Sequence, residues 1–155
     1  MDEPKIGSAD TYDVLLVEDN ESDEALALRA LRKLTPPPAV KVAHDGLQAL
    51  TILMDGPAPR LVLLDLKLPR LSGLEVLEAM RQSPDLKSVP VIALSSSDLT
   101  GDLERCQLGG ANGFVTKPVG YHEYNAAVAS ITTFWLSDER SVETAPAASR
   151  FTRLP

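Results

Sequence analysis

Three stretches of this chain are apolar at every position, and they constrain the possible folds more than any other feature. They cover residues 14–17, 61–64 and 91–94. A strand with one face in water alternates apolar and polar residues, whereas a strand covered on both faces does not. The three runs therefore predict central strands of a parallel sheet with helices on both sides. Shorter runs at 40–42 and 113–115 predict less central strands.

The segments between these runs have helical patterns. Residues 21–34 open with three acidic residues, which favour the positive end of a helix dipole, and Asn20 or Ser22 can supply the cap. An apolar face at helical spacing follows these acids. Further helices are predicted over residues 46–54, 74–82, 99–108 and 121–136.

Five strands that alternate with five helices predict an α/β fold of the (βα)5 type. Strand–helix–strand units impose parallel strands and right-handed crossovers. The simplest solution is a flavodoxin-like doubly wound sheet with strand order 2-1-3-4-5. The 155 residues suit one domain, which we expect over residues 11–137. The polar residues 1–10 and the Ala-, Ser- and Pro-containing tail over 138–155 are expected to be flexible.

Composition excludes several classes of function. The net charge of −7 argues against nucleic-acid binding, which needs a basic surface to neutralise phosphates. The single cysteine, Cys106, rules out an internal disulfide and a multi-cysteine zinc site. We find no signal peptide and no apolar stretch near the roughly 20 residues of a membrane span. The expected location is therefore the cytoplasm, without membrane contact.

Polar residues follow four of the five predicted strands. Glu18 and Asp19 come after the first strand, Asp65 after the third, Ser95 after the fourth and Lys117 after the fifth. Doubly wound sheets bind ligands outside the carboxyl ends of their strands. Taken singly, each residue is more often a helix cap or a turn residue. Their occurrence at successive strand ends is what indicates a site.

The residue types at this edge suit the formation and breakdown of an aspartyl phosphate. Three clustered carboxylates repel one another, and a hard cation such as Mg²⁺ relieves that repulsion. A carboxylate can attack phosphorus, while a metal and a lysine neutralise the transferring group. A serine hydroxyl can donate to a phosphoryl oxygen.

With these residues in place, the chain resembles the response-regulator receiver family over residues 12–136. The motifs are Val17-Glu18-Asp19-Asn20, Asp65-Leu66-Lys67-Leu68-Pro69 with Gly73, Ser95 after an apolar strand, and Thr116-Lys117-Pro118. Their spacing along the chain is highly specific to that family.

The resemblance implies a role for each residue of the acidic part of the site. Asp65 is the expected phosphoacceptor. Asp19 and Asp65 would bind Mg²⁺ directly, Glu18 through water, and Lys67 through its backbone carbonyl. The family implies a protein that catalyses its own phosphotransfer and dephosphorylation rather than an enzyme with a separate substrate.

The resemblance also implies a switch. Ser95 and Lys117 would bind the phosphoryl group, and the Lys117–Pro118 peptide bond would be cis, as only X–Pro bonds readily allow. Phe114 matches the aromatic switch position, which turns inward when Ser95 moves. Because phenylalanine has no polar tip, any readout at Phe114 must rely on packing.

The family implies a sensor histidine kinase as the partner. Residues 18–23 and the Phe134-Trp135-Leu136 end of the last helix further resemble the stand-alone regulators that serve bacterial phytochrome kinases. No segment long enough for an output domain follows the predicted domain, so we expect output through protein contacts or phosphorelay.

The last helix also suggests a homodimer. Tyr124, Ile131 and Trp135 belong to a stripe at alternating spacings of three and four. Such a stripe can cover the sheet, but aromatic residues are also enriched in interface cores, and adjacent Phe134 and Trp135 cannot both point inward. We therefore predict a dimer interface that includes Tyr124, Ile131, Phe134 and Trp135.

Three other functions remain open. A phosphate-ester hydrolase of the haloacid dehalogenase type would use an Asp nucleophile, but its usual second Asp is replaced by Lys67. Flavin or dinucleotide binding suits the fold, yet no glycine-rich loop follows the first strand, where Glu18 and Asp19 would repel phosphate. A docking module that is never phosphorylated would not need the complete set of acids, hydroxyl and lysine.

Overall fold

The three fully apolar runs form the centre of a parallel sheet. Strands β1 (Val14–Val17), β3 (Leu61–Asp65) and β4 (Val91–Ser95) are buried at every position. This computed structural model describes residues 11–95, 100–117 and 120–137. The two predicted flexible ends, 1–10 and 138–155, and Pro118 with its predicted cis bond lie outside the described residues.

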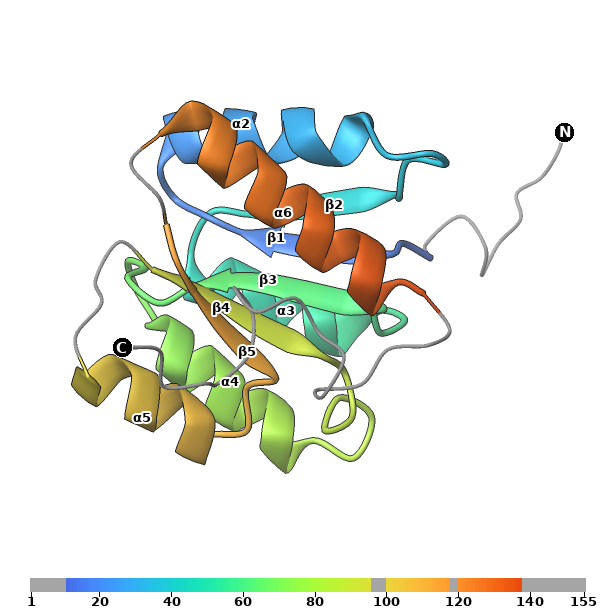
Figure 1. Ribbon diagram of the computed structural model, residues 1–155. Coiled ribbons are helices and arrows are strands. Elements are labelled where there is room, and N and C mark those ends of the chain that lie inside the picture. Colours follow the sequence, from blue (N-terminus) through green and yellow to red (C-terminus); the bar gives the residue numbers. More distant parts are fainter. Residues whose placement is uncertain (1–10, 96–99, 118–119, 138–155) are drawn as a thin grey trace, which may run out of the picture.

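The predicted topology is confirmed. Strands β2 (Val40–Ala43) and β5 (Gly113–Thr116) form the edges of a five-stranded sheet in the order β2-β1-β3-β4-β5. All four pairings are parallel. The carboxyl ends of the strands therefore meet at one edge of the sheet (Figure 1).

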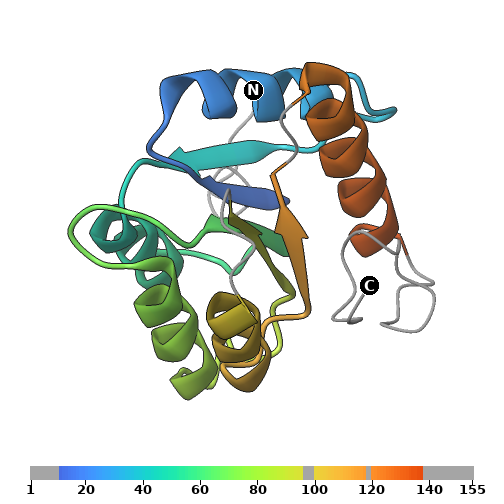
Figure 2. The same cartoon turned by 60° about the vertical axis from the view of Figure 1, so that its left-hand side comes forward.

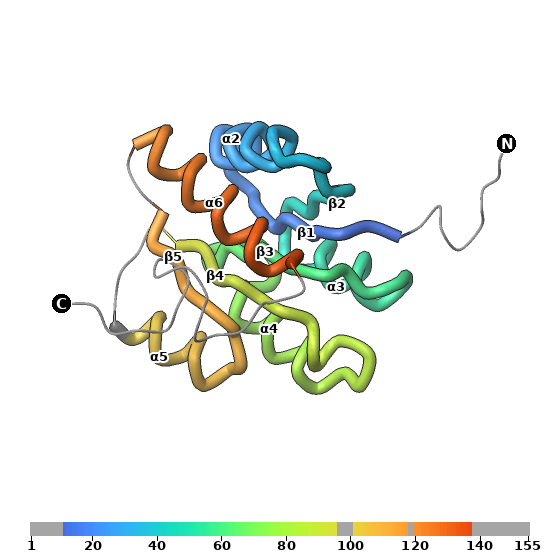
Figure 3. The backbone as a smooth tube through the Cα atoms, turned by 45° about the vertical axis from the view of Figure 1, so that its right-hand side comes forward, coloured from blue at the N-terminus to red at the C-terminus, as the bar shows by residue number. Residues whose placement is uncertain are grey.

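Two layers of helices cover the sheet, as the rotated views show (Figure 2, Figure 3). Helices α2 (Glu21–Arg32) and α6 (Tyr121–Trp135) lie on one face, and α3 (Gly46–Asp55), α4 (Gly73–Gln82) and α5 (Thr100–Leu108) lie on the other. In β1, Val14 and Leu16 belong to the first core, while Leu15 and Val17 belong to the second. This division explains why each position of the strand is apolar.

Helix ends follow the local sequence signals. Asn20 caps α2, since its side chain accepts a hydrogen bond from the Asp23 backbone N–H at 2.9 Å. Ser72 and Glu75 form a reciprocal capping box at the start of α4. The structure ends α2 at Arg32, two residues before the predicted end.

None of the helices in the described part of the chain is long and apolar enough to cross a bilayer.

The stripe on α6 belongs to the chain's own core. Tyr124, Ile131 and Trp135 are 4%, 1% and 4% exposed and pack with residues of α2 and the sheet. These side chains are thus already covered within one chain, and their predicted place in a dimer interface stays a prediction. Phe134 is partly buried against the same cluster, so it alone of the four keeps exposed surface.

Candidate functional site

The strand register brings the predicted site residues together. Val17 pairs with Leu64, so Glu18 and Asp65 follow at neighbouring strand ends. On the other side of β3, Asp65 pairs with Leu94, and Ser95 comes next in β4. The backbone N–H of Lys117 donates to the Ser95 carbonyl at 2.7 Å, which fixes the end of β5 beside β4.

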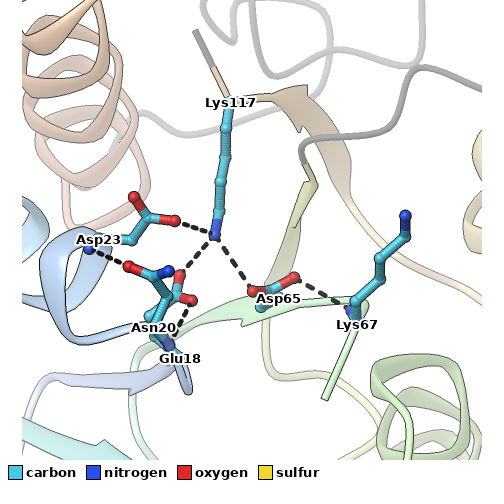
Figure 4. A network of polar contacts seen from close by, with 6 residues as sticks. All are labelled: Glu18, Asn20, Asp23, Asp65, Lys67 and Lys117. Carbon is cyan, nitrogen blue, oxygen red and sulfur yellow. Dashed lines mark hydrogen bonds and ion pairs between the residues drawn. The ribbon is translucent and has the colours of Figure 1, made fainter. Parts of the chain in front are cut away.

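Lys117 lies at the centre of the charged network (Figure 4). Its Nζ is 2.7 Å from Glu18 Oε1, 2.9 Å from Asp23 Oδ2 and 3.1 Å from Asp65 Oδ2. The Glu18 side chain is 0% exposed, and those of Lys117 and Asp65 are 9% exposed. A buried charge is costly without a partner, and here the ammonium group supplies that partner to the carboxylates.

Burial and charge shift the ionisation of this network. Burial is the main reason that the pKa of Glu18 rises to about 7, and Asp65 adds to the rise while Lys117 opposes it. Burial lowers the pKa of Lys117, but its hydrogen bonds to Glu18 and Asp23 and the charge of Asp65 outweigh this and raise it above its ordinary value. Lys117 is therefore cationic, and the acids carry more negative charge than it neutralises.

The excess negative charge fits a divalent metal ion. One carboxylate oxygen from each of Glu18, Asp19 and Asp65 lies within 4.8 Å of the other two. The three residues line a cavity of about 550 Å³ together with Lys67 and Lys117. Hard cations such as Mg²⁺ bind carboxylate oxygens and keep several waters, so an open acidic cavity suits them. Asp19 is exposed, which leaves a route for solvent and ligand.

The loop after β3 fixes the orientation of Asp65. The Lys67 backbone N–H donates to Asp65 Oδ1 at 3.1 Å, while the Lys67 side chain points away from the carboxylate (Figure 4). Gly73 N–H donates to the Leu66 carbonyl at 3.0 Å and closes the loop. A Cβ atom on Gly73 would lie 2.4 Å from the Asp65 carbonyl oxygen, so only glycine allows this approach. The structure thereby explains the motif spacing from Asp65 to Gly73.

Ser95 and Phe114 are both internal. Ser95 is 0% exposed, and Phe114 is 8% exposed in a small cluster with Leu66, Ala93 and Cys106. The side chain of Phe114 is already buried in this structure. The predicted switch turns this side chain inward only when Ser95 moves, so it would have to begin from another conformation than the one seen here. The switch roles of Ser95 and Phe114 stay predictions.

Sequence reasoning missed Asp23 as part of the site. From the sequence, Asp23 is one of three acids in the first turn of α2 that complement the helix dipole. The structure places its carboxylate on Lys117, whereas Glu24 instead pairs with His44 at 2.9 Å. A helix that begins directly after β1 must place its first turn over the sheet edge. The sequence does not indicate which of the three acids faces the lysine.

Comparison with known proteins is consistent with this geometry. A profile of the response regulator receiver domain matches residues 14–129, which extend from β1 into α6. The chain belongs to the response regulator receiver family. The match therefore extends over most of the chain and includes Glu18, Asp65 and Lys117, which lie together in Figure 4.

Three relatives illustrate the similarity of this receiver domain to known proteins. The probable methanogenesis regulatory protein FilR2 of Methanothrix harundinacea is 35% identical and covers 85% of this chain and 88% of its own. A Mn²⁺-bound structure of the response regulator Rcp1, known from Synechocystis, is 34% identical with a TM-score of 0.77 and covers 88% and 99%. The phosphorylated cyanobacterial phytochrome response regulator RcpA is 34% identical with a TM-score of 0.78 and covers 82% and 95%.

The raised pKa of Glu18 predicts a pH-dependent effect of metal on stability. Below its unfolded pKa of 4.5 the carboxyl is protonated in both states, and above about 7 it is charged in both. Between these limits the folded chain binds more protons, so rising pH destabilises the metal-free fold. We expect Glu18→Gln to become progressively more stable than the unaltered chain from about pH 5 to pH 8, by about 1–3 kcal/mol.

Urea unfolding at several pH values, with a chelator or with millimolar Mg²⁺, measures this difference. Mg²⁺ should stabilise the unaltered chain more than Glu18→Gln, because only the unaltered chain presents all three carboxylates. If the stability difference between the two chains in the chelator did not change with pH, the raised pKa of Glu18 would be contradicted.

Proposed function

We propose that this chain is a single-domain response regulator that accepts a phosphoryl group from a sensor histidine kinase on Asp65, with Mg²⁺ as cofactor. One observation carries the proposal. Lys117 contacts Asp65 at 3.1 Å beside a cluster in which Asp65 shares a metal-sized space with Glu18 and Asp19. The proposed nucleophile, the lysine ammonium and the proposed metal ligands thus lie next to one another.

The residues suggest how the transfer proceeds. A carboxylate oxygen of Asp65 attacks phosphorus, and the bond from phosphorus to the donor nitrogen breaks as the donor imidazole leaves. Lys117 neutralises charge on the phosphoryl oxygens, and Ser95 would donate its hydroxyl to one of them. A bound Mg²⁺, held by Asp19, Asp65 and the Lys67 carbonyl, with Glu18 through water, would supply further positive charge. Later attack by water on the phosphorus breaks its bond to the Asp65 oxygen, releases inorganic phosphate and restores the carboxylate.

The kinase that we propose is of the bacterial phytochrome type, in the cytoplasm. The similarity to RcpA, which is described as a phytochrome response regulator, supports this choice. A broad hollow of about 870 Å³ along α2 is lined by Asp19 and Glu21, which also line the acidic cavity. A partner that delivers a phosphoryl group to Asp65 could contact this adjoining surface. Output would follow through protein contacts or further phosphorelay.

Incubation with Mg²⁺ and a small acyl-phosphate donor tests the proposed function. We expect stoichiometric phosphate on the chain, stable to acid and labile to base, and none when a chelator removes Mg²⁺. Sustained turnover of unrelated phosphate esters would instead favour the hydrolase of the dehalogenase type. Absence of any phosphate with an active donor would support a docking module that is not phosphorylated.

We also propose that the chain forms a homodimer through the region of α5, β5 and α6. Leu108 on α5 is 88% exposed, and Phe134 on α6 keeps partial exposure. Both are apolar side chains that a second copy could cover. Equilibrium sedimentation at micromolar concentration should show dimers that Leu108→Glu weakens. A monomer both with and without phosphorylation would contradict this proposal.

A further inference from the structure

Lys117 donates its three N–H groups to three carboxylates. One of these carboxylates lies outside the acidic cluster of Glu18, Asp19 and Asp65 that could hold a metal ion. Glu18 and Asp65 belong to that cluster, whereas Asp23 does not. We propose that Asp23 is a positioning residue that competes with the phosphoryl group for Lys117 and so slows phosphorylation of Asp65. The inference rests on the proposed function, because it concerns the rate of the same transfer.

The start of α2 fixes Asp23 in place. Its backbone N–H donates to the Asn20 side chain at 2.9 Å, and the Asn20 backbone N–H donates to Glu18 Oε2 at 3.2 Å. The Asp23 carboxylate reaches Lys117 from α2, on the side opposite Lys67 (Figure 4). Its side chain is 33% exposed, against 0% for Glu18. Asp23 is thus the most solvated of the three partners and the one whose contact the chain can most readily release.

Charge determines the direction of the effect. An incoming phosphoryl donor is anionic, and Lys117 can only stabilise it with positive charge that other groups do not already neutralise. A bound metal would offset the charges of Glu18, Asp19 and Asp65. Asp23 is not among these clustered acids, so its charge would remain. Removing the Asp23 charge therefore weakens its hold on Lys117, leaves more of the ammonium charge for the phosphoryl group, and lessens repulsion of the anionic phosphoryl donor. We expect Asp23→Asn to raise the phosphorylation rate about threefold or more.

The experiment compares phosphorylation rates with a small acyl-phosphate donor and Mg²⁺ in the full chain. Asp23→Asn and Asp23→Ser should both accelerate the reaction, and their urea unfolding curves show whether each variant folds. Glu21→Gln is the matched control, because exposed Glu21 lies in the same helical turn and lines the same cavity without contacting Lys117. It should change the rate much less.

The double variant with Lys117→Gln separates the ion pair from general charge. In that background Asp23→Asn should give no more acceleration than Glu21→Gln does. Three results would overturn the inference but not the proposed function. Asp23→Asn could accelerate the reaction equally with and without Lys117, or Glu21→Gln could accelerate it as much as Asp23→Asn does. Asp23→Asn could also leave the rate unchanged or lower it. Absence of phosphate on the unaltered chain would overturn the proposed function together with the inference.

Discussion

Replacing Lys117 by methionine should slow phosphorylation of Asp65 by about a hundredfold or more. The ammonium is the one cation within hydrogen-bond distance of Asp65 Oδ2 in the described part of the chain. Loss of one preorganised group that stabilises transition-state charge typically costs about 10²–10³ in rate. Rapid-quench measurement with a small acyl-phosphate donor gives the two rates. A loss below about tenfold would contradict the role of Lys117.

The same substitution should also destabilise the fold, and the loss should depend on pH. Glu18 would remain fully buried without its cation, so its pKa would rise further from about 7. Its protonation compensates at low pH, but at about pH 8 we expect a loss of about 3 kcal/mol. Lys67→Met is the matched control, because the Lys67 side chain points away from Asp65 (Figure 4). It should leave stability nearly unchanged at both pH values.

Gly73→Ala should have the largest structural effect on Asp65. The added Cβ would lie 2.4 Å from the Asp65 carbonyl oxygen and 2.7 Å from Leu66 Cα, and these backbone atoms cannot rotate away. We expect a loss of about 2 kcal/mol or more, of which the better helix propensity of alanine offsets at most about 1 kcal/mol. Because β3 must shift, the phosphorylation rate should fall about tenfold or more.

Gly101→Ala is the control for this substitution. In the described part of the chain, no atom beyond the neighbouring residues and the nearby helix backbone lies within 4 Å of a Cβ on Gly101, which is in the first turn of α5. Urea unfolding and phosphorylation kinetics of both variants test the comparison. Gly73→Ala with unaltered stability and rate would show that the approach of α4 to the Asp65 backbone is not required for the site.

Much of the fold was predictable because β1, β3 and β4 are covered on both faces. That burial removes polar residues from every position and makes the strands visible in the sequence. The site followed from topology, since parallel neighbours place their carboxyl ends together. Glu18, Asp65 and Lys117 therefore meet although the first and the last are 99 positions apart in the sequence.

Two features required the structure. Spacing alone does not distinguish an α6 stripe that covers the sheet from one that meets a second chain, and here Tyr124, Ile131 and Trp135 cover the sheet. The contact of Asp23 with Lys117 depends on where the first turn of α2 points, which the acids of that turn do not reveal. Both cases depend on side-chain direction rather than on residue type.

Tandem mass spectrometry of the phosphorylated chain can locate the phosphoryl group and so tests whether Asp65 is the acceptor. After reaction with a small acyl-phosphate donor and Mg²⁺, we expect one added phosphoryl group on the peptide that contains Asp65, and none anywhere in Asp65→Asn. Thermal unfolding of that variant checks that it remains folded. Phosphate at another residue of the unaltered chain, or equal labelling of Asp65→Asn, would contradict the assignment of Asp65 as the phosphoacceptor.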